Sequence, residues 1–161
     1  MKKHLINTFI ASLFAVASCL AQGSITVTLT TPTQSSATCT FAATSISEDV
    51  NRASGVPGSF VFDAITLTKA IDKCSVPLYH ALFVGTAITK VVISFFNSSN
   101  GATGTEVLRL TLANSTVTGV TDADSAIGPV EKLTLQYKII TIFDPIDGTT
   151  ATCSSISPTC S

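Results

Sequence analysis

ITLTKAIDKCSVPLYHALFVGTAITKVVISFF, residues 65–96, is the stretch that decides the fold. Ile65 and Leu67 alternate with threonines, which predicts a β-strand with one buried face. The same two-residue period from Val91 to Phe95 predicts a second strand. A helical segment separates the two, so the predicted order is strand, turn, short helix, strand.

The helix is expected between Ser75 and Gly85. Ser75 is a candidate N-cap, and Pro77 fits the first turn, where its missing N–H leaves no hydrogen bond unmade. Gly85 is a candidate C-cap because glycine readily adopts the left-handed conformation. The apolar stripe of this helix comprises Leu78, Ala81 and Leu82. We expect the stripe to pack on a sheet, at the end or side of a barrel.

Alternation recurs through most of the chain and predicts a mainly β, antiparallel fold. The other runs are Ile25–Leu29, Thr38–Ile46, Phe60–Phe62, Leu108–Leu112 and Leu133–Ile139. The phenylalanines at 60 and 62 have the opposite parity to Ile65, so we expect a bulge or strong bend near Asp63 and Ala64.

Turn-forming residues separate these runs. They predict a hairpin loop at residues 97–104 and a longer loop at residues 121–129. After Asp144 the chain is rich in Ser and Thr and contains Cys153 and Cys160. We therefore expect residues 145–161 to form an irregular tail that is tethered through its cysteines.

The N-terminus has the pattern of an export signal. Lys2 and Lys3 precede an apolar run, Leu5–Val16, that is too short to span a bilayer. One interpretation is cleavage after Ala21; the other is a lipobox that makes Cys19 the site of lipidation. A buried N-terminal strand or helix is the alternative to either. A signal peptide at residues 1–21 and a barrel domain at residues 22–144 would give a secreted, periplasmic or cell-surface protein, with a lipoprotein as the variant.

Four cysteines remain after the predicted signal. An even number in an exported chain indicates two disulfides, with three possible connectivities. Cys153 and Cys160 enclose a short polar loop, and we therefore hypothesise that they pair and that Cys39 pairs with Cys74. A metal site and free thiols in a cytoplasmic protein are the alternatives. The metal site is disfavoured because the chain has no C-x-x-C pattern and only two histidines.

Composition argues against several classes of partner. The net charge is −1, and 12% of residues are charged, against about 25% in an ordinary domain. No basic cluster exists for nucleic acid, and no stretch beyond the signal is apolar enough to span a membrane. A surface of small uncharged residues is compatible with close packing between identical subunits.

Three motifs carry a resemblance to a known family. The residues are Thr68, Lys69, Asp72, Lys73, Ser75, Pro77 and Leu78 around the helix start, then Glu106, Leu108, Thr111 and Leu112, then Pro129, Glu131, Leu135, Tyr137 and Ile140. Together they resemble the tube protein of the type VI secretion system, the haemolysin-coregulated protein (Hcp) family. The resemblance implies a β-barrel with one flanking helix, hexameric rings that stack into a tube, and effector cargo or other secretion-system components as partners.

Catalytic interpretations are weaker than structural ones. Asp72, Ser75 and His80 resemble a hydrolase triad only by residue type, and Ser75 is better explained as a helix cap. Glu106 and Glu131 allow an acid–base pair, but both lie where strands begin, and solvated carboxylates are common there.

A calcium site is disfavoured as well. Asp122 and Asp124 lie in a Gly-containing loop that lacks the ligand count of a calcium site. We therefore expect no catalytic residue, no cofactor and no metal. The predicted function is a non-enzymatic, exported Hcp-like structural protein. The alternative is a monomeric extracellular β-barrel domain for adhesion or ligand binding.

Overall fold

The structure is a computed structural model that describes residues 23–30, 38–48, 50–52, 60–97, 104–126, 128–157 and 159–161. The predicted signal peptide, with Cys19, lies outside these residues. The barrel strands are β1 (Ser24–Thr30), β2 (Thr38–Ser47), β5 (Ile65–Ala70), β6 (Ala87–Phe96), β7 (Glu106–Ser125) and β8 (Gly128–Gln136). Helix α1 spans Ser75–Val84. The remaining strands are β3 (Val50–Arg52), β4 (Phe60–Phe62), β9 (Ile139–Asp144), β10 (Thr149–Ser154) and β11 (Thr159–Cys160).

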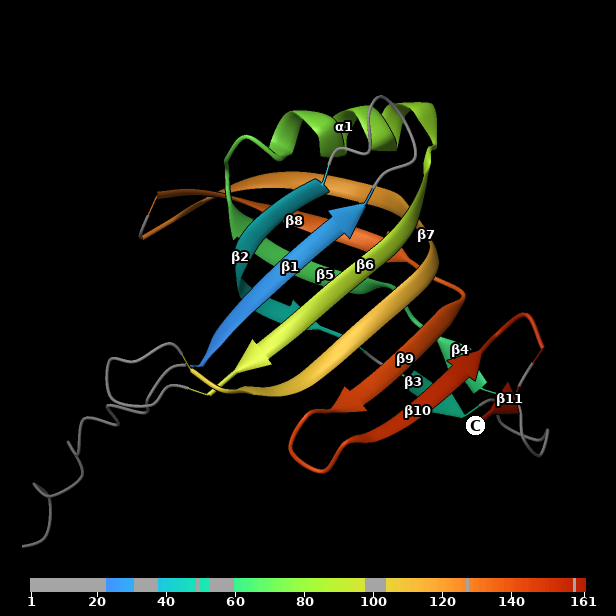
Figure 1. Cartoon of the computed structure of the whole chain (residues 1–161). Helices are drawn as coiled ribbons and strands as arrows, with labels where there is room; N and C mark the ends of the chain where they lie inside the picture. The colour runs from blue at the N-terminus through green and yellow to red at the C-terminus, as the bar shows by residue number, and fades with distance from the viewer. Residues whose placement is uncertain are drawn as a thin grey trace, which may run out of the picture.

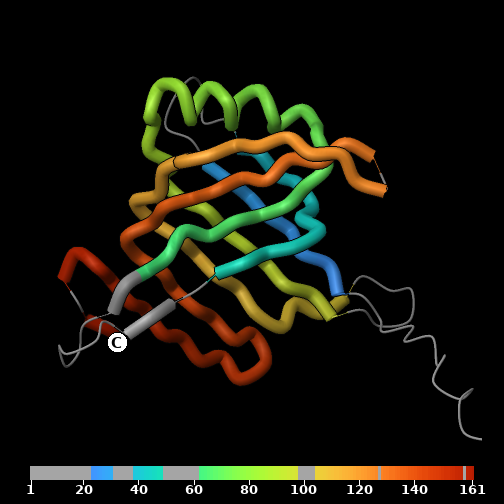
Figure 2. The backbone as a smooth tube through the Cα atoms, turned by 180° about the vertical axis from the view of Figure 1, so that it is seen from behind, coloured from blue at the N-terminus to red at the C-terminus, as the bar shows by residue number. Residues whose placement is uncertain are grey.

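Six strands close into an antiparallel barrel. Their order is β7-β6-β1-β2-β5-β8, and β8 pairs back onto β7 (Figure 1). Closure satisfies the backbone groups of both edges that an open sheet would expose. The predicted mainly β barrel with one short helix is therefore confirmed, and α1 lies across one end of the barrel in both views (Figures 1 and 2).

The barrel interior is filled by the apolar face that alternation predicted. Val27, Leu29, Leu67 and Ile93 are fully buried. Leu78 and Ala81 of α1 are buried against this core, and Leu82 packs at its border. Burial of these side chains is the main stabilising contribution, at about 1.5–3 kcal/mol for each large one.

Strand β7 has two partners along the same edge. Residues 109–113 pair with β9, whereas residues 116–125 pair with β8. Asn114 lies between the two sets with φ 52°, a left-handed conformation that asparagine tolerates better than most residues. The inward parity of β7 shifts there, so that Leu112 and then Ser115 are buried.

The break in β7 corrects the prediction of one continuous strand at Leu133–Ile139. Tyr137 and Lys138 leave the ladder opposite Asn114, and the chain continues as β9. As a consequence Ile140, not Ile139, faces the core. Tyr137 stays buried because its ring stacks on Phe62, with ring centroids 5.0 Å apart.

Two loop predictions were wrong. The expected loop at residues 121–129 is mostly strand, because β7 and β8 pair as far as Ser125 and Gly128. The expected irregular tail after Asp144 is a regular arm, in which β10 pairs with β9 and β11 pairs with β10. Cross-strand partners decide both, and those partners lie outside any local window. The bulge or bend predicted near Asp63 and Ala64 falls where the chain passes from β4 to β5, which belong to different sheets.

Candidate functional site

A buried ion pair lies beside the start of α1. Lys69 on β5 faces Glu131 on β8 in the strand register, and Lys69 Nζ lies 2.6 Å from Glu131 Oε1. Both side chains are 0% exposed. The ammonium also lies 5.0 Å from the centre of the Phe41 ring. Two opposite charges this close and this dry need further hydrogen bonds to offset their lost hydration.

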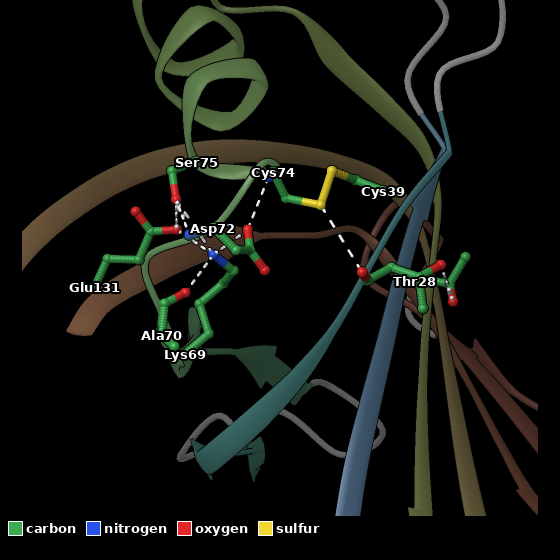
Figure 3. The surroundings of a disulfide bond; sticks show 9 residues. Thr28, Cys39, Lys69, Ala70, Asp72, Cys74, Ser75 and Glu131 are labelled. Carbon is green, nitrogen blue, oxygen red and sulfur yellow. Dashed lines mark hydrogen bonds and ion pairs between the residues drawn. A yellow bond between two sulfur atoms is a disulfide. The ribbon is translucent and has the colours of Figure 1, made fainter. Parts of the chain in front are cut away.

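Asp72 and Ser75 supply those hydrogen bonds (Figure 3). Lys69 Nζ donates to Asp72 Oδ1 at 2.8 Å and to the Ala70 carbonyl at 2.8 Å. The Ser75 hydroxyl donates to Glu131 Oε1 at 2.9 Å. Among the described residues, Glu131 Oε2 has no hydrogen-bond partner. The cluster therefore joins β5, β8 and the first turn of α1.

The same contacts correct the predicted helix cap. Cys74 is the N-cap, and Ser75 is the first residue of the helix. The Asp72 carboxylate accepts a hydrogen bond from the Cys74 N–H at 2.8 Å, while the Ser75 side chain is turned toward Glu131. Gly85 ends the helix with φ 67°, as predicted.

A disulfide joins α1 to β2 next to this cluster. Cys39 and Cys74 are bonded with Cα atoms 5.7 Å apart (Figure 3). Strand β2 pairs with β5 only from Ala43 onward, because β5 ends at Ala70. The bond therefore anchors the start of α1 to a part of β2 that the β5 ladder does not reach.

The second disulfide closes the C-terminal arm. Cys153 and Cys160 are cross-strand partners on β10 and β11, with Cα atoms 4.2 Å apart. Thr152 and Ser161 exchange two backbone hydrogen bonds beside it. The structure thus contains both pairings that the sequence analysis hypothesised.

Asp72, Ser75 and His80, the triad interpretation that the sequence analysis disfavoured, do not come together as a triad. Asp72 is paired with Lys69, Ser75 with Glu131, and His80 is exposed on α1. Each of the first two side chains already has a structural partner. The arrangement therefore offers no activated nucleophile.

The two glutamates are separate ion pairs rather than an acid–base pair. Glu106 binds Arg109, which lies over the Phe143 ring, and this contact holds the pKa of Glu106 below its ordinary value. Glu131 was expected to be solvated and is fully buried, because the strand end that carries it is covered by α1.

The carboxylates of the β7–β8 hairpin are exposed. Asp122 accepts a hydrogen bond from Tyr79 of α1, which raises the pKa of that tyrosine. Across the described ranges, no group of three His, Cys, Asp or Glu side chains is placed to hold a metal ion.

None of the helices that the structure describes has the length and apolarity to cross a membrane.

The two-residue alternation of the strands could have predicted the buried pair, but the sequence analysis did not use it. Lys69 has the parity of Ile65 and Leu67, and Glu131 has that of Leu133 and Leu135. Both charges therefore fall on inward faces. The sequence analysis instead expected Glu131 to be solvated, because carboxylates at the ends of strands usually are.

Comparison with known proteins adds two findings. A sequence profile described as "Type VI secretion system effector, Hcp" matches residues 22–143. A search of curated proteins gave no match.

Solved structures share the fold. Hcp1 from Salmonella typhimurium aligns at 14% identity with a TM-score of 0.71, covering 87% of this chain and 100% of that chain. The secreted protein Hcp3 from Pseudomonas aeruginosa aligns at 18% identity with a TM-score of 0.68, covering 83% and 98%. The anti-feeding prophage baseplate, a six-fold symmetrised structure, aligns at 13% identity with a TM-score of 0.51, covering 74% and 92%.

Proposed function

The chain belongs to the Hcp family of the type VI secretion system, and we propose that it is an exported member that assembles into a closed ring of six identical subunits. The family consists of non-enzymatic structural proteins that build the secretion tube and carry effectors. The observation that carries the proposal is the six-stranded barrel closed by β8 on β7, with one helix across its end. Family members with this fold form hexameric rings.

Export is supported by two independent features. Residues 1–21 have a basic start and a short apolar run, and both disulfides are of the kind that persists in oxidising compartments. Intact mass of the protein from its native host tests this part. We expect loss of the first 21 residues, or loss of 18 with a lipid on Cys19. A chain that retains Met1 would contradict export and leave the ring proposal standing.

Ring assembly is tested by light scattering on the oxidised, mature chain. We expect a mass six times that of the subunit, because a closed ring has a single defined size. A strict monomer at high micromolar concentration would refute the ring. It would favour instead a monomeric extracellular β-barrel domain for adhesion or ligand binding.

A further inference from the structure

The outermost strands of the sheet form an arm that extends beyond the barrel. The strand order at this side is β7-β9-β10-β11, so β10 lies outside β9 and β11 covers the far edge of β10 (Figure 1). Both β10 and β11 follow residue 143, where the match to the family profile ends. These two strands therefore lie outside the part of the chain that the family profile describes.

Alternate residues of β10 direct their backbone groups toward β11. On the β9 side, the Ser155 N–H donates to the Lys138 carbonyl at 2.9 Å. Thr152 has the opposite parity and exchanges two hydrogen bonds with Ser161, at 2.8 and 2.9 Å, on the β11 side. Backbone groups alternate between the two edges of a strand, so residues with the parity of Thr152 all face away from β9. They are here called the β10 edge and comprise Thr150, Thr152 and Ser154.

Strand β11 covers this edge through few contacts. It has two residues, Thr159 and Cys160, and both are exposed. Cys160 is disulfide-bonded to its cross-strand partner Cys153. Strand pairing without a buried apolar face is only marginally stable in water. The disulfide is therefore the main contact that keeps β11 in place, and without it the outward backbone groups of β10 would face water.

The β10 edge is complementary to a second copy of itself. Its three residues are symmetric about Thr152, so two antiparallel copies place Thr152 opposite Thr152 and Thr150 opposite Ser154, and each pair can exchange backbone hydrogen bonds. The sequence of β10, TTATCS, contains neither the charges nor the proline that keep natural sheet edges apart. The Thr152 hydroxyl already lies 3.1 Å from that of Thr141 on β9, and cross-strand threonine pairs of this kind stabilise sheets. Self-pairing would continue this row of hydroxyls into the second copy.

The charged residues beside β10 do not oppose this arrangement. Asp144 and Asp147 lie at its start, whereas Lys138 lies beside Ser155 at its end. Arg109 is opposite Phe143 near the start and is paired with Glu106. Two antiparallel copies therefore place their acidic ends apart.

We propose that the Cys153–Cys160 disulfide holds β11 over the β10 edge, and that its reduction makes β10 a docking strand for β10 of a second copy of this chain. The reductant is a dithiol. The S–S bond of the protein breaks, a cyclic disulfide forms in the dithiol, and its two hydrogens leave Cys153 and Cys160 as thiols. Cys160 is exposed, whereas Cys74 of the other disulfide is fully buried, so a dithiol reacts with the arm first.

Mutation uncovers the edge without a reductant. Cys153→Ser with Cys160→Ser leaves the disulfide between Cys39 and Cys74 intact. At high micromolar concentration this double variant should have at least twice the light-scattering mass of the oxidised native chain. Native chain treated with dithiothreitol until only the arm disulfide is reduced should behave in the same way.

The backbone of Thr152 provides the specific test. Adding Thr152→Pro to the double variant removes the central outward N–H, and proline is tolerated where the N–H of an edge strand faces away from its neighbour. The mass should return to that of the oxidised chain. Thr152→Val in the same background is the matched control, because it keeps the N–H, and it should assemble like the double variant.

Amide hydrogen exchange is a second measurement that needs no proline. In the described residues, pairing on the β11 side reaches Thr152, so exchange of the Thr150 amide should slow only when the edge is docked. A double variant with the mass of the oxidised chain would overturn the proposal. A mass increase that survives Thr152→Pro, is lost in Thr152→Val, or leaves Thr150 exchange unchanged would overturn it as well, because the contact would then lie elsewhere. The comparison is between oxidised and uncovered forms of one chain, so its outcome does not depend on the proposed ring.

Discussion

Replacing Glu131 by glutamine should destabilise the fold far more than any surface charge does. The substitution keeps the shape of the side chain and removes the charge that lies 2.6 Å from Lys69 Nζ. Both side chains are 0% exposed, so water cannot take over the lost interaction. Breaking a buried pair by removing one partner costs about 3–5 kcal/mol. Asp72 remains 2.8 Å from the ammonium, and we therefore expect a loss at the lower end, about 3 kcal/mol.

A matched control comes from the pair on β7. Glu106→Gln removes the partner of Arg109, whose side chain is 42% exposed. Exposed pairs contribute about 0–1 kcal/mol. The double replacement Lys69→Met with Glu131→Leu should recover most of the stability, because an apolar pair of similar volume leaves no unpaired charge inside.

Urea unfolding of the oxidised chain, followed by far-UV circular dichroism, measures these differences. The midpoints should shift while the slope m stays constant, because the change in exposed surface is the same. A loss below about 1 kcal/mol for Glu131→Gln, similar to the Glu106 control, would refute the reasoning. It would mean that the cluster is hydrated in solution. A double replacement no more stable than Glu131→Gln alone would show that the ion pair itself is not the cause.

Three further predictions concern sulfur and pH. Replacing Cys39 and Cys74 by serine should lower the free energy of unfolding in urea by about 3–4 kcal/mol, because their disulfide closes a loop of 35 residues. Replacing Cys153 and Cys160 by serine should lower it by about 2 kcal/mol, because that loop spans 7 residues. Equal losses, or free thiols in non-reducing peptide mapping, would contradict this. Burial and a hydrogen bond to a carboxylate raise the pKa of Tyr137 above its ordinary 10.0. Its contribution is therefore complete below pH 10 and is lost as pH rises further, so Tyr137→Phe should flatten the alkaline fall in Tm; an unchanged fall would exclude this residue as its cause. The pKa of Glu106 is lowered, so its pH dependence runs the other way: its contribution to stability is complete above pH 4.5, its ordinary pKa, and is lost as pH falls. The difference in unfolding free energy between the native chain and Glu106→Gln should therefore narrow from pH 7 to pH 3. A difference that widens would contradict this prediction.

Local periodicity determined most of the barrel. The two-residue period placed β1, β2, β5 and β6, because side chains alternate between the two faces of a strand wherever that strand pairs. Pro77 and Gly85 located α1, since both act through their own backbone geometry. The family motifs added the expectation of a closed barrel, which no local pattern contains.

Only the tertiary structure decided where one strand ends and the next begins. Residues 133–139 alternate without interruption in the sequence, yet the strand breaks at Tyr137. The cause lies on the neighbouring strand β7, where Asn114 adopts a left-handed backbone conformation. The arm after Asp144 likewise depends on β9 as a partner. Hydrogen bonding between strands is non-local, so neither outcome is encoded in the residues that show it.

The buried Lys69–Glu131 pair depended partly on the sequence and partly on the tertiary structure. Alternation alone puts Lys69 and Glu131 on inward faces. Whether an inward charge near a strand end meets water or protein depends on what covers that end of the barrel. Here α1 covers it, tied to β2 through Cys74, and Ser75 supplies a hydroxyl to Glu131. The two charges are dry because a helix distant from Glu131 in sequence excludes water, and strong pairing in a dry site follows from its low dielectric.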